Sequence, residues 1–172
     1  IPIIGIIEPT IKYLKDNNIQ NIGIIATTGT IRSNGWQNGI KKHIENSRVQ
    51  SKACPLLAPM AEEGWTENEI AMLAVHEYLK DIKQIDALIL GCTHYPLFKS
   101  IIQNELGPDT EIINTGEMVA KEVSEYIKSN NLENALNIKA TTQMYLTDLE
   151  CNFINVAKKL MNQENIELKK ID

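Results

Sequence analysis

The chain has 172 residues, 43% of them hydrophobic and 23% charged, which is the composition of a globular protein with a buried core. Its formal net charge of -5 and the absence of a Lys- or Arg-rich cluster argue against nucleic acid or an anionic membrane as the main partner. The sequence shows no apolar run near the roughly 20 residues of a membrane span, no signal-peptide pattern and only three cysteines, which together favour a reducing cytoplasm.

Short apolar runs alternate with helical patterns through the first half of the chain. In order, we expect a strand over 3–7, a helix over 10–17, a strand over 21–26, a helix from the turn at 27–30 to residue 46, and a strand over 49–54. An irregular stretch, PLLAPMAEEG, follows the third strand.

The second half continues the alternation. Thr66 stands three residues before Glu69, the spacing of a capping box, so a helix is predicted to begin there. Its predicted apolar face consists of Ile70, Leu73, Ala74 and Tyr78. The elements expected next are a strand over 87–90, a helix over 96–107, a strand over 111–113, a helix around 119–127, a strand near 143–146 and a helix from 148.

Strand–helix alternation of this kind predicts an α/β fold in three layers, with a parallel sheet between helices. In such folds ligands bind beyond the carboxyl ends of the strands. Two predicted strands end in small polar residues at that position, IATTGT at 25–30 and ILGCTH at 89–94. The sequence therefore predicts a site where these two strands end.

Cys92, in LILGCTHYPLF, is the strongest single candidate. It follows a glycine at a strand end and stands at the entrance to a helix, where backbone amides lower the pKa of a thiol. His94 is placed to exchange protons with a ligand bound next to Cys92 or to stabilise a thiolate at Cys92. The alternative for Cys92 is a small buried apolar side chain, as most free cysteines are. Cys54 and Cys151 lack such surroundings and are predicted to be structural.

The remaining polar candidates each have two interpretations. Thr27 and Thr30 either cap a helix or bind a carboxylate or phosphate at its free amides. Glu62 is either solvated or folded inward to orient a histidine. A single Cys-x-His pair without a partner pair at ligand spacing predicts no metal site, and no phosphate-binding glycine loop or dinucleotide motif suggests a cofactor.

LGCTHYPL resembles the second cysteine motif of the aspartate/glutamate racemase superfamily, and most closely that of the bacterial glutamate racemases. Four further segments resemble family segments in the same order: PIIGIIEP the crossing between two lobes, ATTGTIRSNGW a threonine loop, ACPLLAPMAEEG a glutamate loop and MYLTDLE the C-terminal segment. The resemblance implies a cofactor-independent isomerase of the cytoplasm that interconverts L- and D-glutamate for peptidoglycan synthesis. Two cysteines, one in each lobe, face opposite sides of the α-carbon.

Residue roles follow from the same resemblance. Cys92 corresponds to the second catalytic base, His94 to a residue assisting proton transfer, and Glu62 to the acid supporting that side. The residues implied to bind the substrate are Thr93, Thr27 and Thr30. The chain departs from the family pattern at Trp36, where a tyrosine is usual, and in INTG at 113–116, so Asn114 is not assigned a role.

The family's aspartate–serine pair and its first cysteine motif, Cys-Asn-Thr, do not occur in this sequence. The chain therefore resembles the C-terminal part of the enzyme, with one complete α/β lobe over 1–113 and part of a second α/β lobe over 114–172. We expect such a chain to be catalytically incomplete. Apolar surface left uncovered on the partial lobe promotes association or disorder, so residues 114–172 are expected to be mobile, rearranged or paired with a second copy, and a homodimer is one of these alternatives.

Three other functions compete with this interpretation. A racemase of the same superfamily acting on aspartate or another substrate is separated from this interpretation only by the glutamate loop, which favours glutamate. A Cys-dependent hydrolase requires Cys92 and His94 to meet, and an orienting Asn or Asp that the sequence does not offer at an obvious spacing. A non-catalytic amino-acid-binding module requires an unreactive Cys92.

Overall fold

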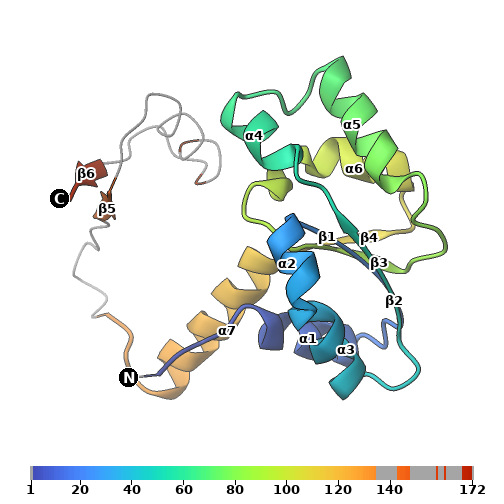
Figure 1. Ribbon diagram of the computed structural model, residues 1–172. Coiled ribbons are helices and arrows are strands. Elements are labelled where there is room, and N and C mark those ends of the chain that lie inside the picture. Colours follow the sequence, from blue (N-terminus) through green and yellow to red (C-terminus); the bar gives the residue numbers. More distant parts are fainter. Residues whose placement is uncertain (1, 135–142, 148–157, 159–160, 162–167, 172) are drawn as a thin grey trace.

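The computed structural model describes residues 2–134, 143–147, 158, 161 and 168–171. Its centre is a four-stranded parallel sheet in the order β2-β1-β3-β4 (Figure 1). The strands are β1 (Asn21–Ala26), β2 (Arg48–Ala53), β3 (Ala87–Leu90) and β4 (Glu111–Asn114). The strands predicted at 21–26 and 87–90 are confirmed residue for residue, and those at 49–54 and 111–113 to within one residue.

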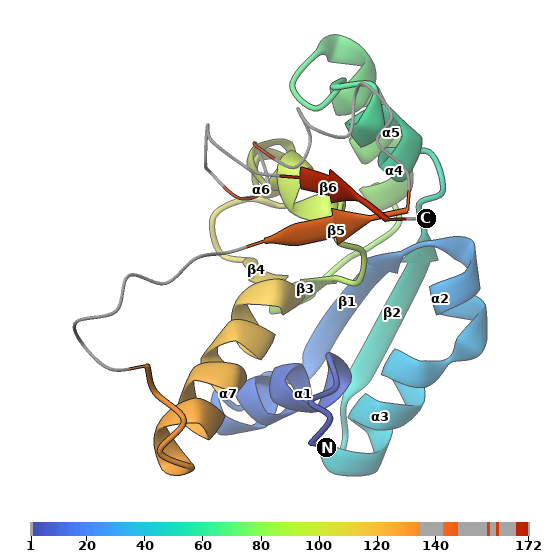
Figure 2. The ribbon, with the colours of Figure 1, turned by 90° about the vertical axis from the view of Figure 1, so that its left-hand side faces the viewer.

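Helices cover both faces of the sheet, so the predicted three-layer α/β fold is confirmed. The helices are α1 (Ile7–Asp16), α2 (Thr28–Ser33), α3 (Gly35–His43), α4 (Leu57–Glu62), α5 (Glu69–Leu79), the 3₁₀ helix η1 (Tyr95–Phe98), α6 (Lys99–Leu106) and α7 (Thr115–Ser129). Figures 1 and 2 both show α1, α3 and α7 on one face and α4, α5 and α6 on the other.

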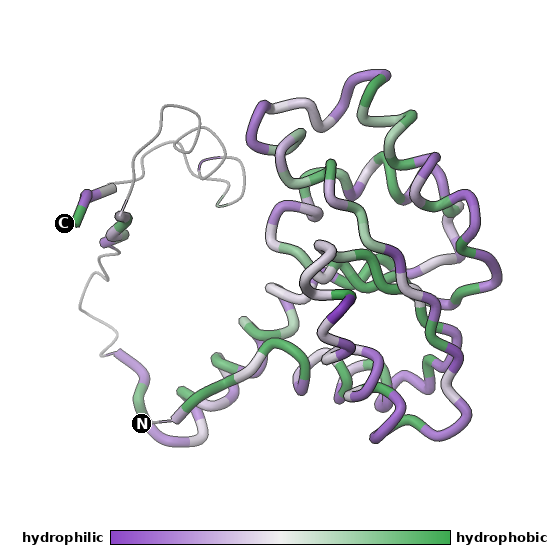
Figure 3. The backbone as a smooth tube through the Cα atoms, in the orientation of Figure 1, coloured by the Kyte–Doolittle hydropathy of each residue, from purple (hydrophilic) through white to green (hydrophobic). Residues whose placement is uncertain are grey.

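The two inner strands are buried on both faces, which explains their unbroken apolar sequences. Along β3, Leu88 and Leu90 pack into the core under α4, α5 and α6, whereas Ala87 and Ile89 pack under α1, α3 and α7. In Figure 3 the hydrophobic positions gather along these strands and the outer loops are hydrophilic. Burial of each large apolar side chain here contributes roughly 1.5–3 kcal/mol to the hydrophobic stabilisation.

The strand predicted at 3–7 is wrong. Ile3 is 92% exposed, and the hydrophobic segment containing it runs outside the sheet (Figure 3). The chain becomes helical at Ile7 instead, and Pro9 falls in the first turn of α1, where its missing N–H costs nothing. An apolar run indicates a strand only where a neighbouring strand accepts it, and among the described residues none pairs with this one.

Three other elements differ from the prediction. The helix expected from 27–30 to 46 is divided at Asn34, whose φ of 54° lies in the left-handed region and separates α2 from α3. The stretch PLLAPMAEEG, predicted to be irregular, contains α4. The helix expected at Thr66 begins at Glu69 because Asn68 is its cap, accepting a hydrogen bond from the Ala71 amide at 2.9 Å.

The predicted apolar face of α5 is half right, because Ala74 and Tyr78 pack against the core but Ile70 and Leu73 do not. The helix buries Ala71, Val75 and Leu79, whereas Ile70 and Leu73 are 54% and 70% exposed. Apolar residues occupy every position from 70 to 75, so the periodicity fits two adjacent faces equally well. The sheet and α6 decide which face is covered.

The segment after β4 begins on the main sheet. The Thr115 hydroxyl donates to the Leu90 carbonyl at 3.2 Å, and Met118 is buried in the core beneath α1 and α3. Farther on, β5 (Met144–Leu146) and β6 (Leu168–Lys170) form a separate two-stranded parallel sheet, which lies apart from the main one (Figure 1). The division of the chain at 113 stays a prediction, and the helix expected from 148 begins outside the described residues.

None of the helices in the described part of the chain has the length and apolarity needed to cross a membrane.

Candidate active site

The carboxyl ends of three neighbouring strands converge on one edge of the sheet. Ala26 pairs with Ala53, and Ile25 pairs with Leu90, so β1, β2 and β3 end side by side. The segments that leave these ends are the threonine loop, the loop into α4 and the cysteine loop. Ligands of parallel α/β folds bind at this edge. The three segments that carry the predicted site residues therefore all start at the expected place.

Gly91 allows β3 to end close against β1. Its amide donates to the Ile25 carbonyl at 2.8 Å. A Cβ at this position would lie 3.0 Å from the Ala26 Cβ and 3.2 Å from the same carbonyl oxygen, too close for an unmoved backbone. The glycine before Cys92 is therefore needed for a close approach of two strands, which fixes where the cysteine loop starts.

Cys92, His94 and Glu62 form a chain of three interacting side chains. The Cys92 Sγ lies 3.8 Å from Nδ1 of His94, and Nε2 of the same ring lies 3.3 Å from Oε1 of Glu62. A neutral imidazole with its proton on Nε2 donates to Glu62 while Nδ1 accepts from the thiol. The Glu62 carboxylate is 61% exposed, so this contact contributes little to stability.

The protonation of Cys92 differs from the expectation. Burial raises the pKa of its thiol, and Glu62 raises it further, whereas hydrogen bonds from the His94 and Tyr95 amides lower it. The net pKa lies above the ordinary value, so the predicted lowering by the loop amides is present but burial outweighs it. Cys92 therefore needs a nearby proton acceptor, and His94 is in contact with it.

The threonine loop shows the capping interaction expected of such residues. Thr27 is the N-cap of α2, with its Oγ1 accepting from the Thr30 amide at 3.4 Å and lying 3.0 Å from the Thr30 hydroxyl. Thr93 is exposed beside Cys92. These contacts orient two hydroxyls at the strand edge, and their role in binding a substrate stays a prediction.

Tyr95 is a residue that the sequence did not single out. It is fully buried, and its hydroxyl donates to the backbone carbonyl of Cys54 at 2.7 Å. Burial raises its pKa far above the ordinary value, so the hydroxyl stays protonated and remains a donor. The only signal in the sequence was an aromatic residue directly before Pro96, which does not reveal a partner on another strand.

We expect Cys92 to be the first thiol alkylated in the folded chain. It is partly exposed and in contact with His94, whereas Cys54 is fully buried with its pKa raised to about 12. Limited iodoacetamide treatment followed by mass mapping should label Cys92 well before Cys54. Earlier labelling of Cys54 would remove the physical basis for the site. Cys151, which lies outside the described residues, is predicted to react after Cys92.

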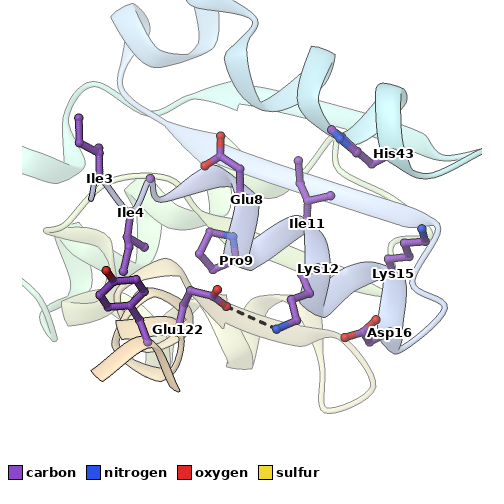
Figure 4. Close-up of a pocket in the computed structure, with 12 residues that line it drawn as sticks. Ile3, Ile4, Glu8, Pro9, Ile11, Lys12, Lys15, Asp16, His43 and Glu122 are labelled. Carbon is purple, nitrogen blue, oxygen red and sulfur yellow. Dashed lines mark hydrogen bonds and ion pairs between the residues drawn. The ribbon is translucent and has the colours of Figure 1, made fainter. Parts of the chain in front are cut away.

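A cleft of about 870 Å³ lies away from these residues, beside α1. It is lined by residues 3–5, by α1 and by α7, and Figure 4 shows Ile3 and Ile4 along one side of it. Lys12, one of its lining residues, is paired with Glu122 at 3.5 Å (Figure 4). None of the predicted site residues lines this cleft, and it offers no thiol, so we place the chemistry at the strand ends.

Metal-binding side chains do not gather in the described part of the chain, where no three His, Cys, Asp or Glu residues lie close enough to bind an ion. His43 and His76 are both exposed. The His43 ring contacts the Gly39 carbonyl at 2.9 Å, and the His76 ring contacts Glu105 at 2.9 Å.

Comparison with known proteins identifies relatives of the whole chain. Residues 1–123 match the Asp/Glu/Hydantoin racemase family. The glutamate racemase of Geobacter metallireducens is 34% identical over 164 residues, covering 94% of this chain and 61% of the relative. The glutamate racemase of Aquifex aeolicus is 38% identical over 165 residues, covering 95% of this chain and 61% of the relative.

Solved structures give the same result. The glutamate racemase of Francisella tularensis, determined in complex with D-glutamate, superposes with a TM-score of 0.90 at 33% identity. That comparison covers 100% of this chain and 64% of the other. The chain thus spans about three-fifths of the length of the relatives that it matches.

Proposed function

The chain belongs to the Asp/Glu/Hydantoin racemase family, and on that premise we propose that it supplies one half of the active site of a glutamate racemase. The observation that carries the proposal is the contact chain from Cys92 through His94 to Glu62 at the carboxyl edge of the sheet. The relatives named as glutamate racemases, and the D-glutamate bound to one of them, support glutamate as the substrate class. Peptidoglycan synthesis is the proposed use of the product.

The proposed reaction is removal and return of the α-proton of glutamate. The Cys92 thiol gives its proton to His94, and the resulting thiolate takes the α-proton from one face of the substrate. The electron pair left on the α-carbon is delocalised into the adjacent carboxyl group, which makes the carbon planar. Inversion then needs an acid that returns a proton to the opposite face.

A second thiol is the proposed acid for the opposite face. The resemblance places it in a Cys-Asn-Thr motif, which the sequence of this chain does not contain. We propose that residues 114–172 belong with the lobe that carries that motif. A protein uniting this chain with such a lobe is called the two-lobed enzyme below. A homodimer and a cytoplasmic location are also proposed, the latter because the two described cysteines are free thiols.

The substrate is tested with the two-lobed enzyme. Chiral chromatography after incubation with L-glutamate should show D-glutamate, and incubation with L-aspartate should show far less inversion. Inversion of aspartate in preference to glutamate would assign the chain to a different member of the family.

Replacement of Glu62 by glutamine should lower kcat of the two-lobed enzyme by roughly 10- to 100-fold, the equivalent of losing one hydrogen bond to a charged group. The His94 ring would lose its carboxylate partner at 3.3 Å, while the thiol stays in place. Glu63→Gln is the matched control, because Glu63 is an adjacent exposed acid, whereas the His94 ring pairs with Glu62. Equal activity of both variants would exclude an orienting role for Glu62.

A Cys-dependent hydrolase is a second candidate, favoured by the contact of Cys92 with His94 and by Glu62 in the orienting position. In that reaction the Cys92 sulfur forms a thioester with the acyl group of an ester and releases the alcohol, and water then cleaves the thioester. Incubation with p-nitrophenyl acetate and mass analysis should reveal an acetyl group on Cys92 if this activity exists. Inversion of glutamate without acyl-enzyme would decide for the racemase.

A further inference from the structure

Tyr95 links the loop that carries Cys92 to a different strand. Its hydroxyl donates to the carbonyl of Cys54, the first residue after β2, whereas the loop itself follows β3. In the sheet β1 lies between these two strands, so the bond reaches across the end of β1. Both Tyr95 and Cys54 are fully buried, so the 2.7 Å hydrogen bond is shielded from water.

The backbone of the same residue faces Cys92. The Tyr95 amide donates to the Cys92 carbonyl at 3.2 Å, which closes a tight turn. The amides of His94 and Tyr95 also lower the pKa of the Cys92 thiol, against the larger effect of burial. Amide donors close to a sulfur favour its thiolate form over the thiol. Tyr95 therefore makes two contacts that bear on Cys92: its hydroxyl binds the Cys54 carbonyl, and its amide binds the Cys92 carbonyl.

We propose that Tyr95 is a positioning residue for Cys92. Its hydroxyl ties the turn that carries Cys92 to the end of β2 and so fixes where the sulfur lies. The inference rests on the proposed function, because the thiolate matters only if Cys92 takes a proton. Removal of the hydroxyl would not orphan its acceptor, since the Cys54 carbonyl also accepts from the Leu57 amide at 3.2 Å. The loss should therefore affect the turn more than the fold.

The test is the pH dependence of alkylation of Cys92 in the 172-residue chain with Tyr95→Phe. Iodoacetamide reacts with the thiolate, so the midpoint of the rate profile reports the pKa of Cys92. We expect the midpoint to rise by about one pH unit, the equivalent of one weakened hydrogen bond to a charged group. Glu62 of α4 and His94 also act on the thiol, and the variant leaves both unchanged.

Tyr78→Phe is the matched control. The Tyr78 hydroxyl accepts from the Leu56 amide at 3.2 Å, so this variant also removes a hydroxyl near the junction of β2 and α4, but the hydrogen bond that it removes is not one from the cysteine loop. Its profile should coincide with that of the unaltered chain. Protection of the fully buried Cys54 from the reagent verifies folding in every sample.

Two results would overturn the proposal. A lowered melting temperature of Tyr95→Phe with an unmoved midpoint would show a structural role alone. Labelling of Cys54 in that variant would show that the hydroxyl is required for folding, which also excludes a positioning role. The alkylation profile of Cys92 is measured without glutamate. An inactive two-lobed enzyme would therefore count against the proposed function without changing the outcome for Tyr95.

Discussion

Replacement of Cys92 by serine should lower glutamate racemisation by the two-lobed enzyme by about a thousandfold or more. A positioned acid or base contributes about 10²- to 10⁴-fold to a reaction of this kind. A serine hydroxyl is a far weaker acid than a thiol, so it supplies almost no base at neutral pH even with His94 3.8 Å from the native sulfur. The substrate should still bind, since the threonine loop and the lobe carrying the Cys-Asn-Thr motif are unchanged.

Circular dichroism of the glutamate solution measures the inversion directly. Cys54→Ala serves as the control, because Cys54 is buried behind the loop with its pKa raised to about 12 and takes no part in the proposed proton transfer. That variant should keep most of its activity. Unchanged turnover in Cys92→Ser would exclude Cys92 as a base.

The 172-residue chain by itself should show no inversion of either glutamate enantiomer. Its proposed site offers one thiol, Cys92, at one face of the substrate, and Cys54 is fully buried. Inversion needs proton donors on both faces, so a single base permits at most slow exchange of the α-proton with retention of configuration. Optical rotation of L-glutamate incubated with the pure chain should therefore stay constant.

A complete site in the chain alone would give a different result. Steady conversion of L-glutamate into D-glutamate, abolished when Cys92 is alkylated, would show that the chain holds both acid and base. The assignment of the second thiol to another lobe would then be wrong.

The elements that the sequence predicted best are those whose surroundings are uniform. Strands β1 and β3 are buried on both faces, so their apolar runs have one interpretation. The segment 3–7 has the same composition but lacks a neighbouring strand among the described residues, which composition cannot reveal. In α5 the apolar residues cover two faces, and only packing against the sheet and α6 selects Ala71, Val75 and Leu79.

The candidate site divides in the same way. The order of local motifs predicted that Cys92, His94 and the threonines lie at strand ends. The contact of Cys92 with His94 joins residues only two positions apart, so it is also local. The pKa of the Cys92 thiol did not follow, because burial depends on residues distant in the chain. The bond from Tyr95 to Cys54 joins positions 41 apart, and no local pattern encodes it.

Exchange of the α-proton in deuterated water tests most directly whether Cys92 is one of two opposed bases. Proton NMR of each glutamate enantiomer, with the unaltered two-lobed enzyme and with Cys92→Ser, separates proton removal from inversion. The unaltered enzyme should exchange the α-proton of both enantiomers. The variant should exchange that of only one, the enantiomer whose proton faces the other thiol, and should invert neither. Equal exchange of both enantiomers by Cys92→Ser would contradict the assignment of Cys92 to one face of the substrate.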